Sequence, residues 1–442
     1  MQKLRRRAAI IRELADGLVL RRATPGDTEA LVRFNGRTLG SPENPDQFVM
    51  HWTGDLMAGR HPTFKPHDFT VVEDQQTGEI VSSLCLFSQR WSYAGVEIPI
   101  GRPELVATDP RYRRRGLVRA QFDVIHEWSA NRGHVLQAIT GIPNFYRQFG
   151  YEMTLELDAD RRGHISGVPK LKELEGEPYW IRPATEADLR FMARVYAQGR
   201  RRSLVSSVVS PRLWRYYVFG RTGGEQFCVI TTPKGERVGL LAHSSQIPRG
   251  DALCSVLYEL KPGANWLSVT PSILRYLSEK GADYAAQHSK EIEWLSFRLG
   301  TQHPAYEAMP DFLQPADIPY LFYLRVPDLP SFLRAIAPVL EARLAKSIAP
   351  GWTGELKLSF FREGIRMAFK GGKLTASEPW SPSQGGESAC FRDGTFLHML
   401  FGLHSLEDLR HLNLDCYACN GDAKALVGIL FPKQPSSVWA VA

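Results

Sequence analysis

The chain has 442 residues, more than one hydrophobic core accommodates, so about two to four domains are expected. Its 43% hydrophobic and 23% charged residues are typical of a globular protein, and no apolar run reaches the roughly 18 residues that span a bilayer. The formal charge of +7 is modest, whereas a nucleic-acid-binding protein concentrates its basic residues in one patch. Arg12, Glu13 and Asp16 interrupt any signal-peptide pattern, so we expect a cytoplasmic protein. From the hydropathy and the charge we expect no membrane span and no nucleic-acid partner.

The six cysteines do not predict a disulfide framework in a chain of this size. Cys416 and Cys419 are the one close pair, and no second pair or nearby histidine completes four zinc ligands. The histidines are scattered without metal-ligand spacing. We therefore expect no metal site.

The first part of the chain predicts strands and helices in alternation. A short basic helix should precede a strand at residues 18–22, and an amphipathic helix should follow the turn at residues 24–27. Residues 69–72 and 80–87 predict a hairpin. The later elements should be a strand at 104–108, a helix at 117–130, a strand at 134–140, a short helix that ends at Gly150, and a last strand.

The turn between residues 108 and 117 has the character of a phosphate site. It breaks at Asp109-Pro110 and then presents Arg113, Arg114 and Arg115 before Gly116. Where such a turn opens a helix, the first free N–H groups and the positive end of the helix dipole face an anion. Gly116 allows the backbone to approach the ligand closely, and the arginines add positive charge.

Two motifs in this part resemble the GCN5-related N-acetyltransferases. Arg113-x-x-Gly116-x-Val118 after VATDP is similar to their pyrophosphate signature, with Val118 where the family usually has glycine or alanine. The segment PNFYRQFGYE at residues 143–152 resembles the second half of the same fold. The resemblance implies that acetyl-CoA is the cosubstrate, without a metal. The residues that it implies as cofactor contacts are Val106, Ala107, Thr108, Arg113, Arg114, Arg115, Gly116, Leu117, Val118, Arg119, Gly141 and Ile142.

The chain also contains an internal repeat. Residues 18–34 are echoed by residues 180–196 at an offset of 161, which matches Thr24 with Thr185 and Asp27 with Asp188. At the same offset the arginine turn falls in PSILRYLSEKG, which has no basic turn with glycine. The second copy should keep the fold and lack the anion site, so acetyl-CoA should bind once per chain.

A third region begins near residue 326. Residues 333–344 predict a helix, and residues 354–380 predict three strands joined at residues 363–364 and 371–372. Helices should follow at residues 393–401, 405–411 and 422–430. A helix-flanked antiparallel sheet of this size resembles the sterol-carrier-protein-2-like domain. Its apolar face either encloses a groove for a lipid or packs on the other domains.

Together these features resemble the Eis-type (enhanced intracellular survival) acetyltransferases. The expected fold is α/β (α+β), with two tandem acetyltransferase domains at residues 1–170 and 171–325 and a sterol-carrier-like domain at residues 326–442. The resemblance implies acetyl transfer to amines of small molecules, such as aminoglycosides or polyamines, or to protein lysines. It also implies a homo-oligomer, a trimer or a hexamer. The acceptor should be set by loops such as residues 41–66 and by the second domain.

The reaction needs a base for the amine, an oxyanion site and an acid for the leaving thiolate. Backbone N–H groups near Val106 to Thr108 are the expected oxyanion site. By resemblance, Tyr146 is the proton donor and the C-terminal carboxylate of Ala442 is the base. Glu104, on the strand that enters the turn, is the competing base. The alternative function is a lipid-binding protein with an auxiliary acyl-CoA site.

Overall fold

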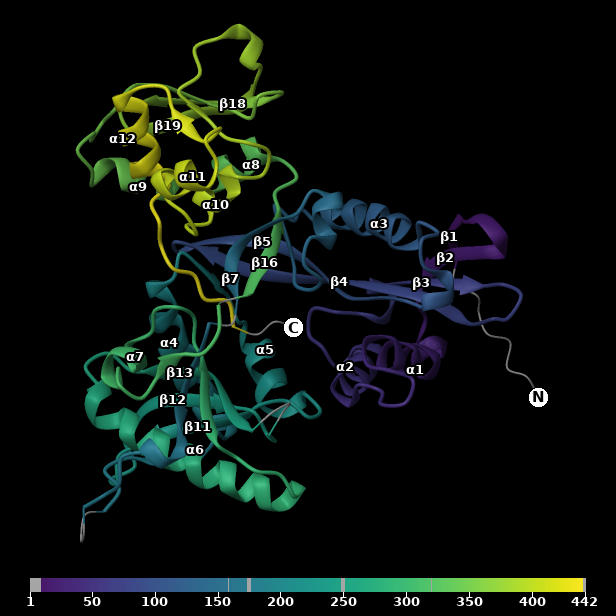
Figure 1. Cartoon of the computed structure of the whole chain (residues 1–442), viewed down its shortest axis with the longest axis vertical. Coiled ribbons are helices and arrows are strands. Elements are labelled where there is room, and N and C mark those ends of the chain that lie inside the picture. Colours follow the sequence, from purple (N-terminus) through teal and green to yellow (C-terminus); the bar gives the residue numbers. More distant parts are fainter. Residues whose placement is uncertain (1–8, 158, 173–175, 248–250, 319, 440–442) are drawn as a thin grey trace.

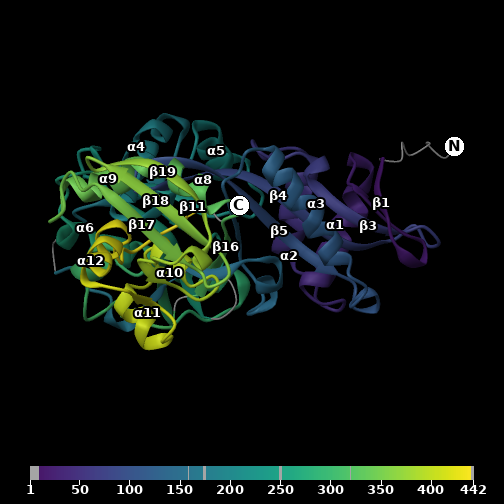
Figure 2. The same ribbon diagram turned by 90° about the horizontal axis from the view of Figure 1, so that it is seen from above.

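The computed structural model describes residues 9–157, 159–172, 176–247, 251–318 and 320–439, and it shows a mixed α/β fold with three sheets. The first sheet and its helices lie to one side of the molecule (Figure 1). The second and third sheets lie beside it, one beyond the other, which the view from above also shows (Figure 2). We refer to each sheet with its covering helices as the first, second and third domain.

The first sheet follows the predicted order of elements. Its strands, in spatial order, are β1 (Ile10–Glu13), β2 (Leu18–Arg22), β3 (Phe69–Asp74), β4 (Ile80–Tyr93), β5 (Val96–Thr108), β6 (Leu136–Ile139), β16 (Tyr320–Arg325) and β7 (Glu152–Leu157), and β10 (Val205–Ser207) pairs with β4. Helices α1 (Thr28–Leu39) and α2 (Gln47–Met57) cover one face, and α3 (Leu117–Asn131) covers the other (Figure 1). The sheet is therefore buried on both faces.

The second sheet repeats this arrangement with shorter strands. Its spatial order is β15 (Gln314–Pro315), β8 (Asp160–His164), β14 (Trp294–Arg298), β13 (Ala252–Leu260), β12 (Arg237–His243), β11 (Gln226–Thr231) and β9 (Trp180–Pro183). Its helices are α4 (Leu189–Gly199), α5 (Pro211–Arg215), α6 (Trp266–His288) and α7 (Pro304–Ala308).

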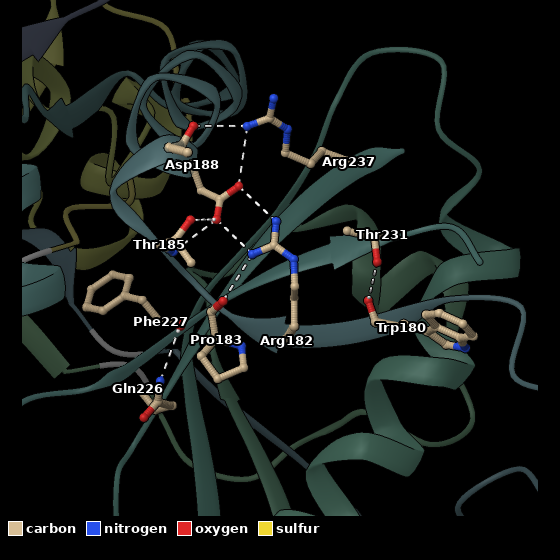
Figure 3. Close-up of polar contacts among 10 residues, drawn as sticks. Trp180, Arg182, Pro183, Thr185, Asp188, Gln226, Phe227, Thr231 and Arg237 are labelled. Atoms are coloured by element: carbon tan, nitrogen blue, oxygen red, sulfur yellow. Dashed lines mark hydrogen bonds and ion pairs between the residues drawn. The ribbon is translucent and has the colours of Figure 1, made fainter. Parts of the chain in front are cut away.

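An arginine–aspartate ion pair occurs at the same place in both copies of the repeat. In the second domain Arg182 forms a bidentate ion pair with Asp188, and Asp188 also accepts the Thr185 backbone N–H at 2.9 Å (Figure 3). In the first domain Arg21 holds Asp27 in the same way, at 2.9 and 2.8 Å, before the start of α1. The charged partners and backbone N–H groups lower the pKa of both carboxyls. The offset of 161 residues thus pairs residues with the same structural task.

The two copies exchange a strand. In the first sheet β16, which follows the second copy in the chain, lies between β6 and β7. In the second sheet β8, which follows the first copy, lies between β14 and β15. The division into domains at residues 170 and 325 stays a prediction. Strand β8, before residue 170, belongs to the second sheet, and strand β16, before residue 326, belongs to the first. Each sheet is completed by a strand from the other segment.

The third domain has the predicted hairpins. Its strands, in spatial order, are β19 (Lys373–Trp380), β18 (Gly364–Lys370), β17 (Gly354–Ser359), β20 (Ala389–Cys390) and β21 (Tyr417–Ala418). Its helices are α8 (Leu329–Ala335), α9 (Ala337–Ala345), α10 (Phe396–Leu400), α11 (Leu406–Leu412) and α12 (Gly421–Leu430). One apolar cluster joins this sheet to the far end of β4 and β5, including Trp91 and Tyr93. The apolar face of the third sheet thus packs on helices and on the first domain.

Three local predictions were wrong. Residues 10–13, predicted as part of a helix, form β1, because they extend the first sheet by pairing with β2. The helix predicted at residues 333–344 is interrupted at Ile336, because Pro338 cannot donate the hydrogen bond that a continuous helix needs. Residues 41–66, expected as a loop, contain α2, whose start is capped by the Asp46 side chain.

Candidate active site

A β-bulge opens the first sheet at the end of β5. The register between β4 and β5 shifts between Ser83 and Cys85, and Leu105 takes a left-handed conformation with φ of 53°. Along the other edge, β5 pairs with β6 at Ile100 and Gly101, and no further pair is formed within the described residues. The end of β5 therefore separates from β6 and leaves a cleft beside residues 106–108.

The turn that follows β5 forms an anion-binding nest. Arg114 and Gly116 are both left-handed, with φ of 65° and 74°. No side chain caps the first turn of α3, so the N–H groups of Leu117, Val118 and Arg119 have no helical acceptor. Backbone N–H groups in such a turn converge on an anion, and the α3 dipole adds to their effect. This geometry suits a phosphate group.

The cleft has a volume of about 550 Å³. Val118 is half-buried in its wall and packs against the core of the first domain, which leaves the cleft open. Two of the predicted contact residues do not line the cleft. Arg115 forms an ion pair with Asp16 at 3.5 Å, and Gly141 packs against the Tyr146 ring. The predicted residues that line the cleft are Val106, Ala107, Thr108, Arg113, Arg114, Gly116, Leu117, Val118, Arg119, Ile142 and Tyr146.

Tyr146 lines the same cleft as the nest, on the short 3₁₀ helix η5 (Phe145–Phe149). Its ring packs edge-on against Phe122 and Tyr323. Gly141 makes room for it, since a Cβ there would lie 3.0 Å from the ring. Among the described residues, none forms a hydrogen bond with the Tyr146 hydroxyl. Burial, with the charge of Glu104, raises the pKa of this hydroxyl well above its usual range, which keeps it protonated.

The part of the chain that forms this cleft is similar to a known protein family. Residues 19–154 match the family described as acetyltransferase (GNAT) domain. The first domain is a GNAT acetyltransferase domain. The match supports an acetyltransferase, and GNAT domains use acetyl-CoA. Comparison with curated protein sequences finds no match.

Solved structures share the fold of the whole chain. A probable N-acyltransferase from Enterococcus faecalis has a TM-score of 0.65 at 14% identity, covering 95% of this chain and 98% of its own. A GCN5-related N-acetyltransferase from Anabaena variabilis has a TM-score of 0.65 at 13% identity, over 95% and 99%. Eis1 from Mycobacterium abscessus has a TM-score of 0.57 at 14% identity, over 95% and 97%. At these identities the likeness concerns the fold.

Glu104 lies one residue before the bulge of the GNAT domain, on the face that α2 covers. Its carboxylate is bound by Arg102, whose side chain is fully buried and stacks over Phe322. Burial raises the pKa of Glu104, and the Arg102 charge opposes this shift. The Nε and Nη1 atoms of Arg102 have no acceptor among the described residues. A buried ion pair thus lies directly before the bulge.

The C-terminal segment packs against β10 and the second domain. After α12 it runs beside β10, where the Ser437 N–H donates to Val205 O at 3.0 Å and the Ser207 hydroxyl donates to Trp439 O at 2.6 Å. The Trp439 ring packs against Trp214 and other aromatic rings of the second domain. Ala442 lies outside the described residues. The described part of the tail therefore ends between the first and second domains.

A second cavity, of about 240 Å³, lies where α2, the second domain and this tail meet. We call it the α2 cavity. Trp52 and Phe48 of α2 form one wall, and Tyr217 and Arg221 of the second domain form another. Tyr217 lies on a one-turn π-helix, an element often found at functional sites. Trp52 stacks on Phe87, and Phe87 pairs with Arg102 across β4 and β5, so this cavity borders the strand that carries the buried pair.

The second copy lacks the features of the cleft. The Asn265 side chain accepts the Leu267 N–H at 3.0 Å, so the start of α6 is capped by the protein itself. Tyr306, which follows β14 as Tyr146 follows β6, donates to Phe297 O and accepts from Leu299 N, both at 3.1 Å. Its hydroxyl is thus held by main chain, whereas the Tyr146 hydroxyl faces a cleft.

Within the described ranges, no group of three or more histidine, cysteine or acidic side chains is arranged to hold a metal ion. No helix in that part of the chain is both long and apolar enough to cross a bilayer.

The nest predicts a specific effect of one methyl group. Gly116→Ala should weaken acetyl-CoA binding about fivefold to tenfold, since a left-handed conformation costs a non-glycine residue about 1–2 kcal/mol. Gly133, at the other end of α3, has φ of 69° and equally open surroundings. Gly133→Ala should lower the melting temperature similarly and leave affinity unchanged. Calorimetric titration with acetyl-CoA measures both; equal affinities for the two variants would contradict the role of the nest.

The sequence did not point to the α2 cavity. Trp52, Tyr217 and Arg221 lie in segments without any motif. Trp52 and Tyr217 are 165 residues apart in the chain. The available signal was the cluster of aromatic residues around residues 214–219, which reads as ordinary core until the fold brings it to α2.

Proposed function

We propose that the chain transfers the acetyl group of acetyl-CoA to a primary amine, binding the cofactor once, in the cleft of the first domain. The observation that carries this proposal is the Tyr146 hydroxyl, unpaired among the described residues, in a cleft that the anion-binding nest also lines. The nest would hold the pyrophosphate through backbone N–H groups and Arg113 and Arg114. The thioester would then extend along residues 106–108 toward Tyr146.

The proposed reaction is a direct transfer. The amine nitrogen, freed of its proton, attacks the thioester carbon, and backbone N–H groups near the bulge stabilise the oxyanion. The C–S bond then breaks, and the Tyr146 hydroxyl donates its proton to the leaving thiolate. The raised pKa of Tyr146 supports this role, because the hydroxyl remains protonated until the sulfur needs the proton.

For the base we propose the C-terminal carboxylate of Ala442, with Glu104 as the second candidate. Deleting Ala442, or extending the chain by two residues, should abolish turnover without unfolding the protein. Glu104→Gln should then lower turnover less, because the contact of its carboxylate with Arg102 makes it a group that positions the bulge. Steady-state kcat and circular dichroism measure both. Full activity of the deletion, with loss of about 100-fold or more in Glu104→Gln, would make Glu104 the base.

The remaining family expectations stay predictions. Aminoglycosides, polyamines and protein lysines are candidate acceptors by resemblance. A sterol-carrier-like third domain, a trimer or hexamer and a cytoplasmic location are likewise expected on that ground. The lipid-binding alternative predicts a co-purified lipid in native mass spectrometry. The apolar packing of the third sheet favours a structural role.

The first experiment is a calorimetric titration of the purified protein with acetyl-CoA, followed by CoA release with a panel of amines. One site per chain and amine-dependent release of CoA would support the proposal. Two sites would overturn the assignment of the second copy, and absence of binding would overturn the proposed function.

A further inference from the structure

The α2 cavity carries an inference about the acceptor, which rests on the proposed function. We propose that the acceptor carries a carboxylate as well as its primary amine, and that Arg221 binds this carboxylate. The acceptor class is therefore a small zwitterionic amine, such as a diamino acid or a lysine-like compound. A simple polycation does not fit this description.

Arg221 is a nearly buried cation with little compensation. Its side chain is 9% exposed, lines the cavity and lies against the Phe48 ring at 5.3 Å. Its one carboxylate contact among the described residues is with Glu225, at 3.3 Å. That distance is long for a charge-assisted hydrogen bond, which is usually about 2.7–2.9 Å. The guanidinium has five N–H donors in a planar fork, so most of its capacity for a carboxylate is unused.

The rest of the cavity wall favours an anion at this end. The carboxylate of Glu156, on another wall, already accepts from the Thr301 hydroxyl at 2.7 Å and from the Ser436 backbone. The Arg221 donors that Glu225 does not use thus remain available among the described residues, whereas the Glu156 carboxylate is already engaged by the protein.

Arg221 is also held in place by the first domain. The next residue, Thr222, donates its N–H at 2.8 Å and its hydroxyl at 3.0 Å to Asp55 of α2. Asp55 is almost fully buried and is further paired with Arg60 at 2.8 Å. The contact fixes the segment that carries Arg221 against α2. A rigid cation of this kind costs little reorganisation when it binds a ligand.

The position of the cavity orients the acceptor. Trp52 in its wall stacks on Phe87, the strand partner of Arg102, and Arg102 binds Glu104, two residues before Val106 of the cofactor cleft. An acceptor with its carboxylate on Arg221 would extend its amine toward this pair. There the N–C bond forms, the C–S bond breaks, the amine proton goes to the base and the Tyr146 proton goes to sulfur.

Size and charge distinguish this class from the polycations. A cavity of about 240 Å³ is smaller than the roughly 300 Å³ at which pockets for drug-sized ligands begin. A linear diamine could enter, but its second ammonium would meet Arg221. Like charges at such a distance in a partly buried site repel each other strongly. A carboxylate in the same place is attracted.

The test compares amines that differ by one carboxylate. L-Lysine and 1,5-diaminopentane share the same chain and terminal amine, as do L-ornithine and 1,4-diaminobutane. We expect kcat/KM for CoA release to be at least about tenfold higher for the amino acid in at least one pair, on the scale of hydrogen bonds to charged groups. Arg221→Gln should reduce this ratio to about one. Glu225→Gln, which removes the competing carboxylate, should increase it.

The ratio is unaffected by the fraction of folded enzyme, and Arg215→Gln, an exposed arginine paired with Glu186, is the matched control that should leave it unchanged. Equal or higher kcat/KM for both diamines would overturn the proposal. So would a preference for the amino acids that survives Arg221→Gln, or CoA release with neither class while acetyl-CoA still binds. Failure of acetyl-CoA to bind in calorimetry would instead overturn the proposed function itself.

Discussion

Tyr146→Phe should lower kcat about 100-fold or more and leave the affinity for acetyl-CoA unchanged. The phenylalanine keeps the edge-on packing with Phe122 and Tyr323, and the lost hydroxyl forms no hydrogen bond with a described residue. What is removed is the proton for the leaving thiolate, and a positioned general acid contributes on the order of 100-fold to 10,000-fold. Single-turnover release of CoA and calorimetry separate the two quantities.

Tyr151 is the matched control, since it belongs to the same aromatic cluster and its hydroxyl hydrogen-bonds His126 at 3.0 Å. Tyr151→Phe should cost about 1 kcal/mol of stability and retain turnover. Because burial raises the pKa of Tyr146 above the ordinary tyrosine value of about 10, wild-type kcat should not fall on the alkaline side below that pH. A Tyr146→Phe variant with unchanged kcat would remove this residue from the mechanism.

The exchanged strand predicts the second large effect: residues 1–170 alone should not fold into a domain that binds acetyl-CoA. In this fragment nothing fills the place of β16 between β6 and β7, where Phe322 and Leu324 are fully buried. Removing a central strand exposes both neighbours' backbone groups and a large apolar area. Circular dichroism, thermal melting and acetyl-CoA titration of the fragment measure the effect.

The register between β7 and β16 offers a control. Leu157 and Tyr320 are partners across the antiparallel pair, so a short glycine-containing turn can join residue 157 directly to residue 320. A fragment of residues 1–157 extended in this way by residues 320–325 should recover a cooperative melt and acetyl-CoA binding. If residues 1–170 already melt cooperatively and bind, the exchanged strand is dispensable and the prediction is wrong.

Local elements were predictable where short-range chemistry decides them. The strand at residues 18–22, the start of α3 at Leu117 and the glycine stop after η5 agree with the structure. The three strands of the third domain also agree, because alternation and glycine turns are read over a few residues. The errors arose where contacts with another segment determine the secondary structure. Residues 10–13 form a strand because they pair with β2 at the edge of the first sheet.

The cofactor cleft was predictable in outline and the acceptor side was not. The arginine turn and Tyr146 stand in contiguous motifs, and their chemistry can be read from residue type and spacing. The bulge at Leu105 has no such signal, because leucine is an unusual residue for a left-handed conformation. Pairing with β4 before and after the bulge holds that conformation, and β5 pairs with β6 only as far as Gly101.

By itself the sequence determined the elements of each copy, the repeat of 161 residues and the phosphate-binding turn, since each depends on residues close together in the chain. The tertiary structure decided which strands complete which sheet and that Arg221 and Trp52 line one cavity. It also decided that, among the described residues, the Tyr146 hydroxyl has no hydrogen-bond partner whereas that of Tyr306 has two. These depend on contacts between distant segments. Their free energy comes from burial and charge in the folded chain, which no local pattern contains.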